Sequence, residues 1–341
     1  MTKMTRIALA ALAVMGATTA MAQSSVTLYG RINTTVEHQK LGDQSTTGLV
    51  NNSSRWGMRG SEDLGGGLKA GFVLESGFNS ATGTGSGPNG GLNFGRQSEV
   101  NLSGNFGMVR LGNFFPESYF ASADYVSMHN HDTGPSSDAL YYDPVWFGKL
   151  GTGNKIAYRT PTMGGFWAEG AMSMHEKAAG TNNKNGYDLA ANYNTGPLHL
   201  GAGYSSADSN WQASLRGLYT IGQFTLGAYY QRNKDANQLA PGGLGSRNNF
   251  RLSGMYALGA SEFHVNVGHA NSWSNASDSA ATQWTLGYNY NLSKRTKVYT
   301  YYTRINNQSN ANYTASGAFS SLASGPGKDF SSFAVGVRHA F

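Results

Sequence analysis

The chain has 341 residues, with 25 Lys and Arg against 19 Asp and Glu and a formal net charge of +6. This excess is small and dispersed, whereas nucleic-acid binders carry a clustered basic stripe, so we expect no nucleic-acid partner. The chain contains no cysteine, which excludes disulfide bonds, thiolate catalysis and cysteine metal sites.

The first 22 residues have the pattern of a secretory signal peptide. Lys3 and Arg6 precede the apolar run IALAALAVMG, and small residues follow it up to Ala22. The apolar run is too short to span a bilayer as a helix, which disfavours the alternative of an N-terminal membrane anchor. We therefore expect cleavage after Ala22 and a mature chain of residues 23–341, in which 23 basic residues stand against 19 acidic ones.

Apolar and polar residues alternate with a period of two through most of this mature chain. The run SVTLYGRINTTV, for example, places Leu28, Ile32 and Val36 on one face and Arg31 on the other. Such alternation predicts strands with one apolar and one polar face. Aromatic residues tend to stand at the ends of the runs, as they do in strands that cross a bilayer. No later stretch is long and apolar enough for a membrane-spanning helix.

The connections between these runs alternate in length. Short turns stand near 61–67, 104–106, 161–165, 194–197, 221–223, 258–260 and 293–295. Longer polar segments stand at 38–53, 79–93, 114–152, 175–185, 233–246, 272–279 and 306–329, and the brief 206–210 is an exception. Short turns at one rim and long loops at the other predict an all-β, 16-stranded antiparallel transmembrane β-barrel. Its last strand would pair with its first, which places Phe341 on the lipid-facing side.

The mature chain resembles the Gram-negative general-diffusion porins, in particular the beta-proteobacterial branch with its anion-selective outer-membrane porins. The motifs that carry the resemblance are SSVTLYGRI, SRWGMRGSEDLGGGLKAGFVLESGF, GRQSEVNLSGNFGMVRLGN, YNLSKRTKVYTYY and the terminal VGVRHAF. The resemblance implies a homotrimer in the bacterial outer membrane, in contact with its lipid and lipopolysaccharide. It also implies that the barrel-insertion machinery reads the terminal aromatic, Phe341.

The same resemblance implies that the third long loop folds into the lumen as a constriction. Residues 113–152 fit this loop, because they form the longest connection and are rich in aromatic residues. A compact extracellular lid is the alternative for this segment.

Charged residues on the lumen-facing parity are the candidates for controlling transport. The basic candidates are Arg31, Arg55, Arg59, Arg96, Lys155 and Arg159. Arg96 is in step with the apolar Val100 and Leu102, so its inclusion follows the family motif rather than parity. The resemblance implies acidic partners on the inserted loop, and the candidates are Glu117, Asp124, Asp138 and Asp143, with Glu117 as first choice. Arg216, Arg251 and Arg338 also oppose apolar residues of their strands.

A water-filled pore needs a charged narrow point rather than catalytic chemistry. We therefore expect passive diffusion of small hydrophilic solutes. Because the basic side chains outnumber the nearby acids, we also expect a preference for small anions. The alternative for each arginine is a structural pairing with a loop carboxylate or with Glu75.

No catalytic, nucleotide-binding or metalloprotease motif is present, so we expect no enzyme activity, no cofactor and no metal. We interpret His129, His131 and Asp132 as a solvated loop cluster rather than a metal site. Three other functions remain open. They are a substrate-specific outer-membrane channel for a sugar, carboxylate or phosphate, a barrel enzyme, and a secreted soluble β-sandwich that binds a ligand.

Overall fold

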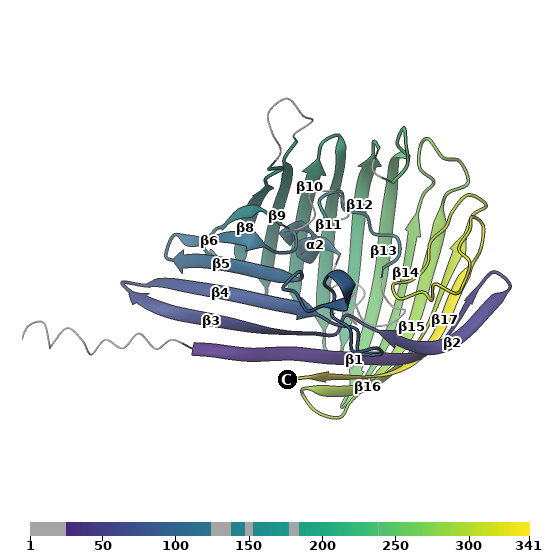
Figure 1. Cartoon of the computed structure of the whole chain (residues 1–341), viewed down its shortest axis with the longest axis horizontal. Helices are drawn as coiled ribbons and strands as arrows, with labels where there is room; N and C mark the ends of the chain where they lie inside the picture. The colour runs from purple at the N-terminus through teal and green to yellow at the C-terminus, as the bar shows by residue number, and fades with distance from the viewer. Residues whose placement is uncertain (1–24, 124–137, 147–152, 177–183, 238) are drawn as a thin grey trace, which may run out of the picture.

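The computed structural model describes residues 25–123, 138–146, 153–176, 184–237 and 239–341 (Figure 1). The expected signal peptide, residues 1–22, lies outside this part of the chain. The described residues form an antiparallel sheet with a short helix, α2 (Glu117–Ser122), and a 3-10 turn, η2 (Pro88–Gly90). No helix among the described residues is both long and apolar enough to cross a membrane.

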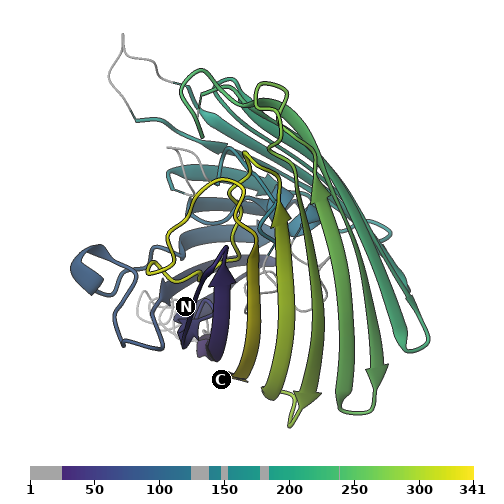
Figure 2. The same cartoon turned by 90° about the vertical axis from the view of Figure 1, so that its right-hand side faces the viewer.

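The strands follow the chain order around the sheet. They are β1 (Ser25–Leu41), β2 (Gln44–Asn51), β3 (Arg55–Gly65), β4 (Leu68–Gly77), β5 (Gln97–Gly104), β6 (Gly107–Asn113), β7 (Lys155–Arg159), β8 (Phe166–Ser173), β9 (Gly186–Thr195), β10 (Leu198–Ala207), β11 (Asn210–Ile221), β12 (Phe224–Asp235), β13 (Gly245–Leu258), β14 (Ser261–Ala270), β15 (Ala281–Asn291), β16 (Thr296–Asn307) and β17 (Phe330–Ala340). Figure 2 shows short turns and the C terminus at one end of the later strands, and longer connections at the other end.

The sheet closes on itself, because β1 pairs with β17 from Arg31 to Leu41. On its other edge β1 pairs with β2 and then with β3. These two strands are halves of one barrel strand, interrupted at residues 52–54, where Ser53 has a positive φ of 56°. The 17 strands of the described residues therefore occupy sixteen barrel positions, which confirms the predicted 16-stranded antiparallel barrel.

The two faces of the barrel invert the polarity of a soluble protein. In β1 the outward side chains of Leu28, Ile32 and Val36 are 60%, 47% and 52% exposed, whereas inward polar side chains such as Asn33 and Gln39 are fully buried. Apolar residues outward and polar residues inward are the pattern of a barrel surrounded by lipid. The parity read from the sequence is therefore confirmed for this strand.

The expected long loop at 38–53 is wrong. Strand β1 continues to Leu41 and β2 resumes at Gln44, so only Gly42 and Asp43 turn the chain, with Gly42 at a φ of 58°. This segment is a polar hairpin that continues the barrel wall. Its polar composition is compatible with strands, because the backbone hydrogen bonds that pair strands do not depend on side-chain polarity. The segment 233–246 is shortened for the same reason, since β12 extends to Asp235 and β13 begins at Gly245.

The connection at 308–329 contributes to a small apolar cluster at the long-loop end. The cluster contains Leu41, Ile305 and Phe330 from the inner wall and Leu322 from the connection. Leu140, from the segment expected to enter the lumen, packs in the same cluster. Two connections far apart in the sequence are thereby joined at this end of the barrel.

Candidate functional site

Helix α2 begins four residues after β6 ends and packs on the inward face of β9, β10 and β11 (Figure 1). Glycines make this close approach possible. A Cβ atom at Gly201 would collide with the carbonyl oxygen of Ala121, and one at Gly203 would collide with the backbone of Ser118. The Ser118 amide donates to Asp188 Oδ1 at 3.1 Å, and its hydroxyl donates to the same carboxylate.

The second described part of the segment, residues 138–146, also lies against inward side chains. Arg251 binds Asp138 at 2.7 Å, and Asp143 accepts a 2.8 Å hydrogen bond from Ser205. Arg247 donates to the Leu140 carbonyl at 2.5 Å. Both described parts of the predicted loop 113–152 thus pack on the inner wall. Asp124 lies outside the described residues, as do residues 124–137 and 147–152.

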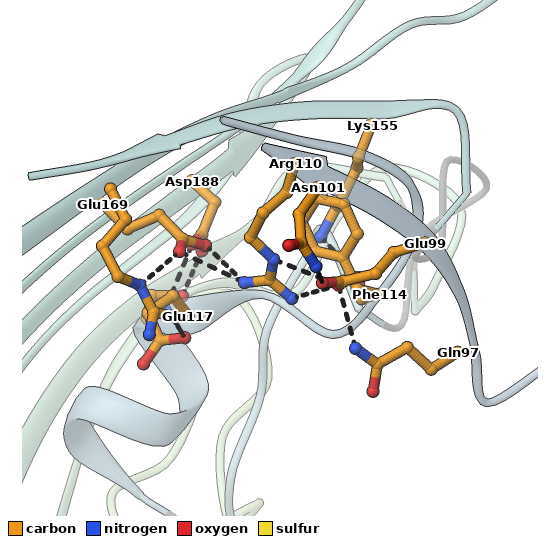
Figure 3. A network of polar contacts seen from close by, with 11 residues as sticks. Gln97, Glu99, Asn101, Arg110, Phe114, Glu117, Lys155, Glu169 and Asp188 are labelled. Carbon is orange, nitrogen blue, oxygen red and sulfur yellow. Dashed lines mark hydrogen bonds and ion pairs between the residues drawn. The ribbon is translucent and has the colours of Figure 1, made fainter. Parts of the chain in front are cut away.

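Charged side chains next to α2 form one connected network (Figure 3). Arg110 lies between two acids, donating to Glu99 Oε2 at 2.7 Å and to Glu169 Oε1 at 3.1 Å. Arg159 continues the network, with its Nε 2.8 Å from Glu169 and its Nη2 2.7 Å from Glu117. The structure therefore brings together Arg159 and Glu117, the wall cation and the first-choice loop acid.

A second charged cluster is formed by residues of β1, β3 and β4 and by Arg96, which directly precedes β5. Glu75 binds the Nε of Arg96 at 2.7 Å and that of Arg55 at 3.7 Å, and it accepts a hydrogen bond from the Tyr29 hydroxyl at 3.1 Å. The alternative pairing with Glu75 thus holds for two of the predicted arginines. The exposed Arg59 lies 5.3 Å from the centroid of the Tyr29 ring.

The remaining described candidates are buried and fix nearby segments of the chain, and they do not line the open lumen. Arg31 is 3% exposed and donates to the carbonyls of Asn52 and Ser53, each at 3.3 Å. Lys155 is 2% exposed, and its Nζ donates to the Phe114 carbonyl at 3.1 Å. Asp138 and Asp143 are likewise buried and hold the 138–146 segment against the wall.

Three members of the network were missed by the sequence reasoning, namely Glu99, Arg110 and Glu169. Arg110 stands between the outward Val109 and Leu111, so strand parity alone indicates its inward direction. The two glutamates lie on the wall strands β5 and β8, whereas the family resemblance implies acidic partners on the loop. Strand parity places all three side chains on the inward face, so it indicates them when every charged residue of the strands is considered.

The arginines of these clusters are more exposed than the acids that bind them. The side chains of Arg55, Arg96 and Arg159 are 22%, 23% and 29% exposed. Their partners Glu75, Glu117 and Glu169 are 11%, 10% and 1% exposed. Four arginines, at positions 55, 96, 110 and 159, bind the four glutamates at 75, 99, 117 and 169, and the exposed Arg59 beside Tyr29 is a fifth cation. The clusters together carry one excess positive charge. Their more exposed side chains are the arginines, so the exposed side of the clusters is cationic.

Burial of the Glu117 carboxyl raises its pKa to about 7, since the effect of burial outweighs that of the neighbouring Arg159. Acidification therefore neutralises the Glu117 carboxylate while the arginines stay protonated. If these side chains line a conducting path, the ratio of anion to cation permeability should rise as the pH falls from about 8 to about 6. Reversal potentials recorded across a planar bilayer in a KCl gradient measure this ratio.

The matched control for this pH series is Glu117→Gln, which is neutral throughout the range. Its permeability ratio should stay near the acidic value of the unaltered protein at every pH. A pH response that survives unchanged in Glu117→Gln would contradict the assignment to this carboxyl.

Comparisons with known proteins agree with the barrel fold. A family model described as Gram-negative porin matches residues 8–310. The chain is 34% identical to outer membrane porin protein 32 of Delftia acidovorans, over 99% of this chain and 100% of the relative. It is 30% identical to an outer membrane porin protein of Bordetella pertussis, over 94% of this chain and 96% of that relative.

Among solved structures, the anion-selective porin from Comamonas acidovorans matches with a TM-score of 0.75 and 28% identity, over 94% of this chain and 100% of that one. The trimer form of OmpT from Vibrio cholerae matches with a TM-score of 0.68 and 17% identity, over 93% and 99%, which is a likeness of fold alone.

Proposed function

The chain belongs to the Gram-negative porin family, and we propose that it forms an outer-membrane channel for passive diffusion of small hydrophilic solutes and ions, with a preference for anions. The observation that carries the preference is the exposure of Arg55, Arg96 and Arg159 above their partly hidden glutamates. Two of the most similar relatives are named as outer-membrane porins, and one matched structure is titled anion-selective.

The proposed mechanism is electrostatic. An anion that enters a narrow pore loses part of its hydration, and the exposed guanidinium groups replace it with N–H donors and positive potential. The glutamates behind them hold the guanidinium groups of Arg96 and Arg159 in place, because an arginine bound by a carboxylate at 2.7–2.8 Å keeps its remaining donors directed. Arg55 lies farther from its carboxylate, at 3.7 Å from Glu75. Cations meet the same positive potential and are disfavoured.

We assign the constriction to the segment 113–152 on one side and the arginines of β3, β6 and β7, with Arg96, on the other. The described parts of the segment support this assignment, because their polar groups bind inward side chains of β9, β10 and β13. Within this proposal Arg55, Arg96 and Arg159 contact the passing ion, and Arg110 positions Glu99 and Glu169. No step of the proposed transport is catalytic.

We further propose that the protein is exported through its signal peptide, residues 1–22, and works as a homotrimer in contact with outer-membrane lipid and lipopolysaccharide. The apolar outward face of the strands supports the lipid contact. At the short-turn rim, the backbone of Phe341 exchanges hydrogen bonds of 3.0 and 3.1 Å with Gly30. Phe341 is 41% exposed, which leaves it accessible at this rim to the barrel-insertion machinery.

The proposed function is tested with purified protein in a planar bilayer. We expect discrete conductance steps and a reversal potential whose sign favours chloride over potassium. A protein that gives no conductance contradicts the channel, and a reversal potential that favours potassium contradicts the anion preference. The same protein should require detergent for extraction, which a secreted β-sandwich would not.

A further inference from the structure

Three inward-facing residues of the barrel wall break the polar pattern of their neighbours. Trp167 on β8 pairs in register with Asn192, and Leu218 on β11 pairs with His199, so each shares the inward face with a polar partner. Met255 on β13 pairs with His264 and shares the inward face in the same way. Apolar side chains facing a water-filled space are costly unless something covers them.

These residues gather around one cavity of about 720 Å³ on the inner side of the wall. Phe120 of α2 adds a further aromatic ring, so the apolar surface comes from the loop as well as from three strands. The polar lining is made by Glu117, Asn192, Asn194, His199 and Arg216. Four lining residues lie next to the short turns at the ends of their strands, namely Asn194, His199, Leu218 and Met255. The cavity therefore lies between α2 and the short-turn rim.

The positive end of this cavity is held in place by the fold. Arg216 is 7% exposed, and its Nη1 donates to the Phe120 carbonyl at 3.2 Å while its Nη2 lies 3.5 Å from Asn192 Oδ1. Close by, the guanidinium of Arg159 lies 4.3 Å from the centroid of the Trp167 ring. The aromatic wall and the cationic groups are therefore adjacent.

Glu117 is the acidic group in this lining, and it already binds Arg159 at 2.7 Å. A cationic solute would have to compete with that guanidinium, whereas an anionic solute meets Arg216 and the Asn and His side chains. His199 lies at the exposed end of the lining.

We propose that this cavity is a binding subsite for organic monoanions that carry an aromatic or bulky apolar group. The apolar group would lie against Phe120, Trp167, Leu218 and Met255, and the carboxylate would face Arg216. The inference rests on the proposed function, since it names a solute class for the same anion-preferring channel. Such solutes would pause in the pore on the short-turn side of α2, and inorganic anions would pass without pausing.

The test uses block of the KCl current in a planar bilayer by benzoate, with acetate as the carboxylate lacking the ring. Covering one side of a phenyl ring favours benzoate by about tenfold in half-blocking concentration. Block should be stronger from the short-turn side. Benzyl alcohol, which lacks the charge, and benzylammonium, which reverses it, should block weakly. Equal block by acetate and benzoate, or by benzylammonium and benzoate, would overturn the subsite.

The variants Leu218→Ser and Met255→Ser remove apolar surface without touching Arg159 or Arg216. Each should raise the half-blocking concentration of benzoate several-fold and leave that of acetate unchanged. The matched control is Val73→Ser, an inward apolar residue on β4 that does not line the cavity and should change neither value. If the control shifts benzoate block as much as the two variants do, the subsite is wrong.

The KCl reversal potential of each sample is measured first. A channel without anion preference means that the proposed function has failed. An anion-preferring channel that treats benzoate and acetate alike means that only the subsite has failed.

Discussion

Replacing both Arg55 and Arg96 by glutamine should turn the preference for anions into a preference for cations. The two arginines share Glu75, so their loss leaves that carboxylate without the two cations that bind it at 2.7 and 3.7 Å. The local balance then changes from five arginines against four glutamates to three against four. An uncompensated carboxylate a few ångströms from a passing ion interacts with it by several kcal/mol where water is partly excluded. This interaction is large enough to reverse the selectivity.

The measurement is the reversal potential in a KCl gradient at about pH 8, where Glu117 is ionised. The barrel should remain folded, since both side chains are partly exposed and lie off the lipid face. The matched control is Arg232→Gln, an exposed arginine on the outward parity of β12. We expect the control to keep the original sign. If the double variant also keeps it, charges elsewhere in the barrel set the preference.

Strand parity allowed most of the wall to be predicted from the sequence. Outward side chains are in lipid and inward ones in water, so each strand must alternate, and a run such as SVTLYGRINTTV carries that requirement openly. Closure between the first and last strands follows from the absence of free edges in such barrels. Backbone hydrogen bonds pair strands whatever the polarity of their side chains. The polar β1–β2 hairpin therefore has the composition of a loop.

The details of the site were less predictable, because they depend on how a loop packs against distant strands. Parity gives the inward direction of Lys155, but its burial comes from Phe114, forty-one residues earlier in the chain. The pairing of Arg159 with Glu117 was suggested by family motifs, whereas the sharing of Glu169 between Arg110 and Arg159 follows from three strands meeting in space. The role of Gly201 and Gly203 depends on the packing of α2 against them, which the sequence pattern does not indicate.

Replacing Arg251 by methionine should release the segment 138–146 from the inner wall. Arg251 and Asp138 are 1% and 4% exposed, and the guanidinium holds the carboxylate through Nη2 at 2.7 Å and Nε at 3.2 Å. Removing one partner of a buried ion pair leaves the other charge uncompensated, which costs about 3–5 kcal/mol. The barrel's backbone ladder is untouched, so the segment should detach while the barrel stays closed. We expect faster proteolysis within this segment and a noisier, larger single-channel conductance.

The double variant Asp138→Asn with Arg251→Met separates charge from packing, because it leaves no buried ion behind. It should recover most of the lost protection, since replacing both partners of a buried pair costs far less than removing one. Arg304→Met is the matched control, because Arg304 binds Asp329 at 2.9 Å with both side chains about 40% exposed, and such surface pairs contribute about 0–1 kcal/mol. If Arg251→Met and Arg304→Met behave alike, the buried pair does not anchor the segment, and the apolar cluster around Leu140 must hold it instead.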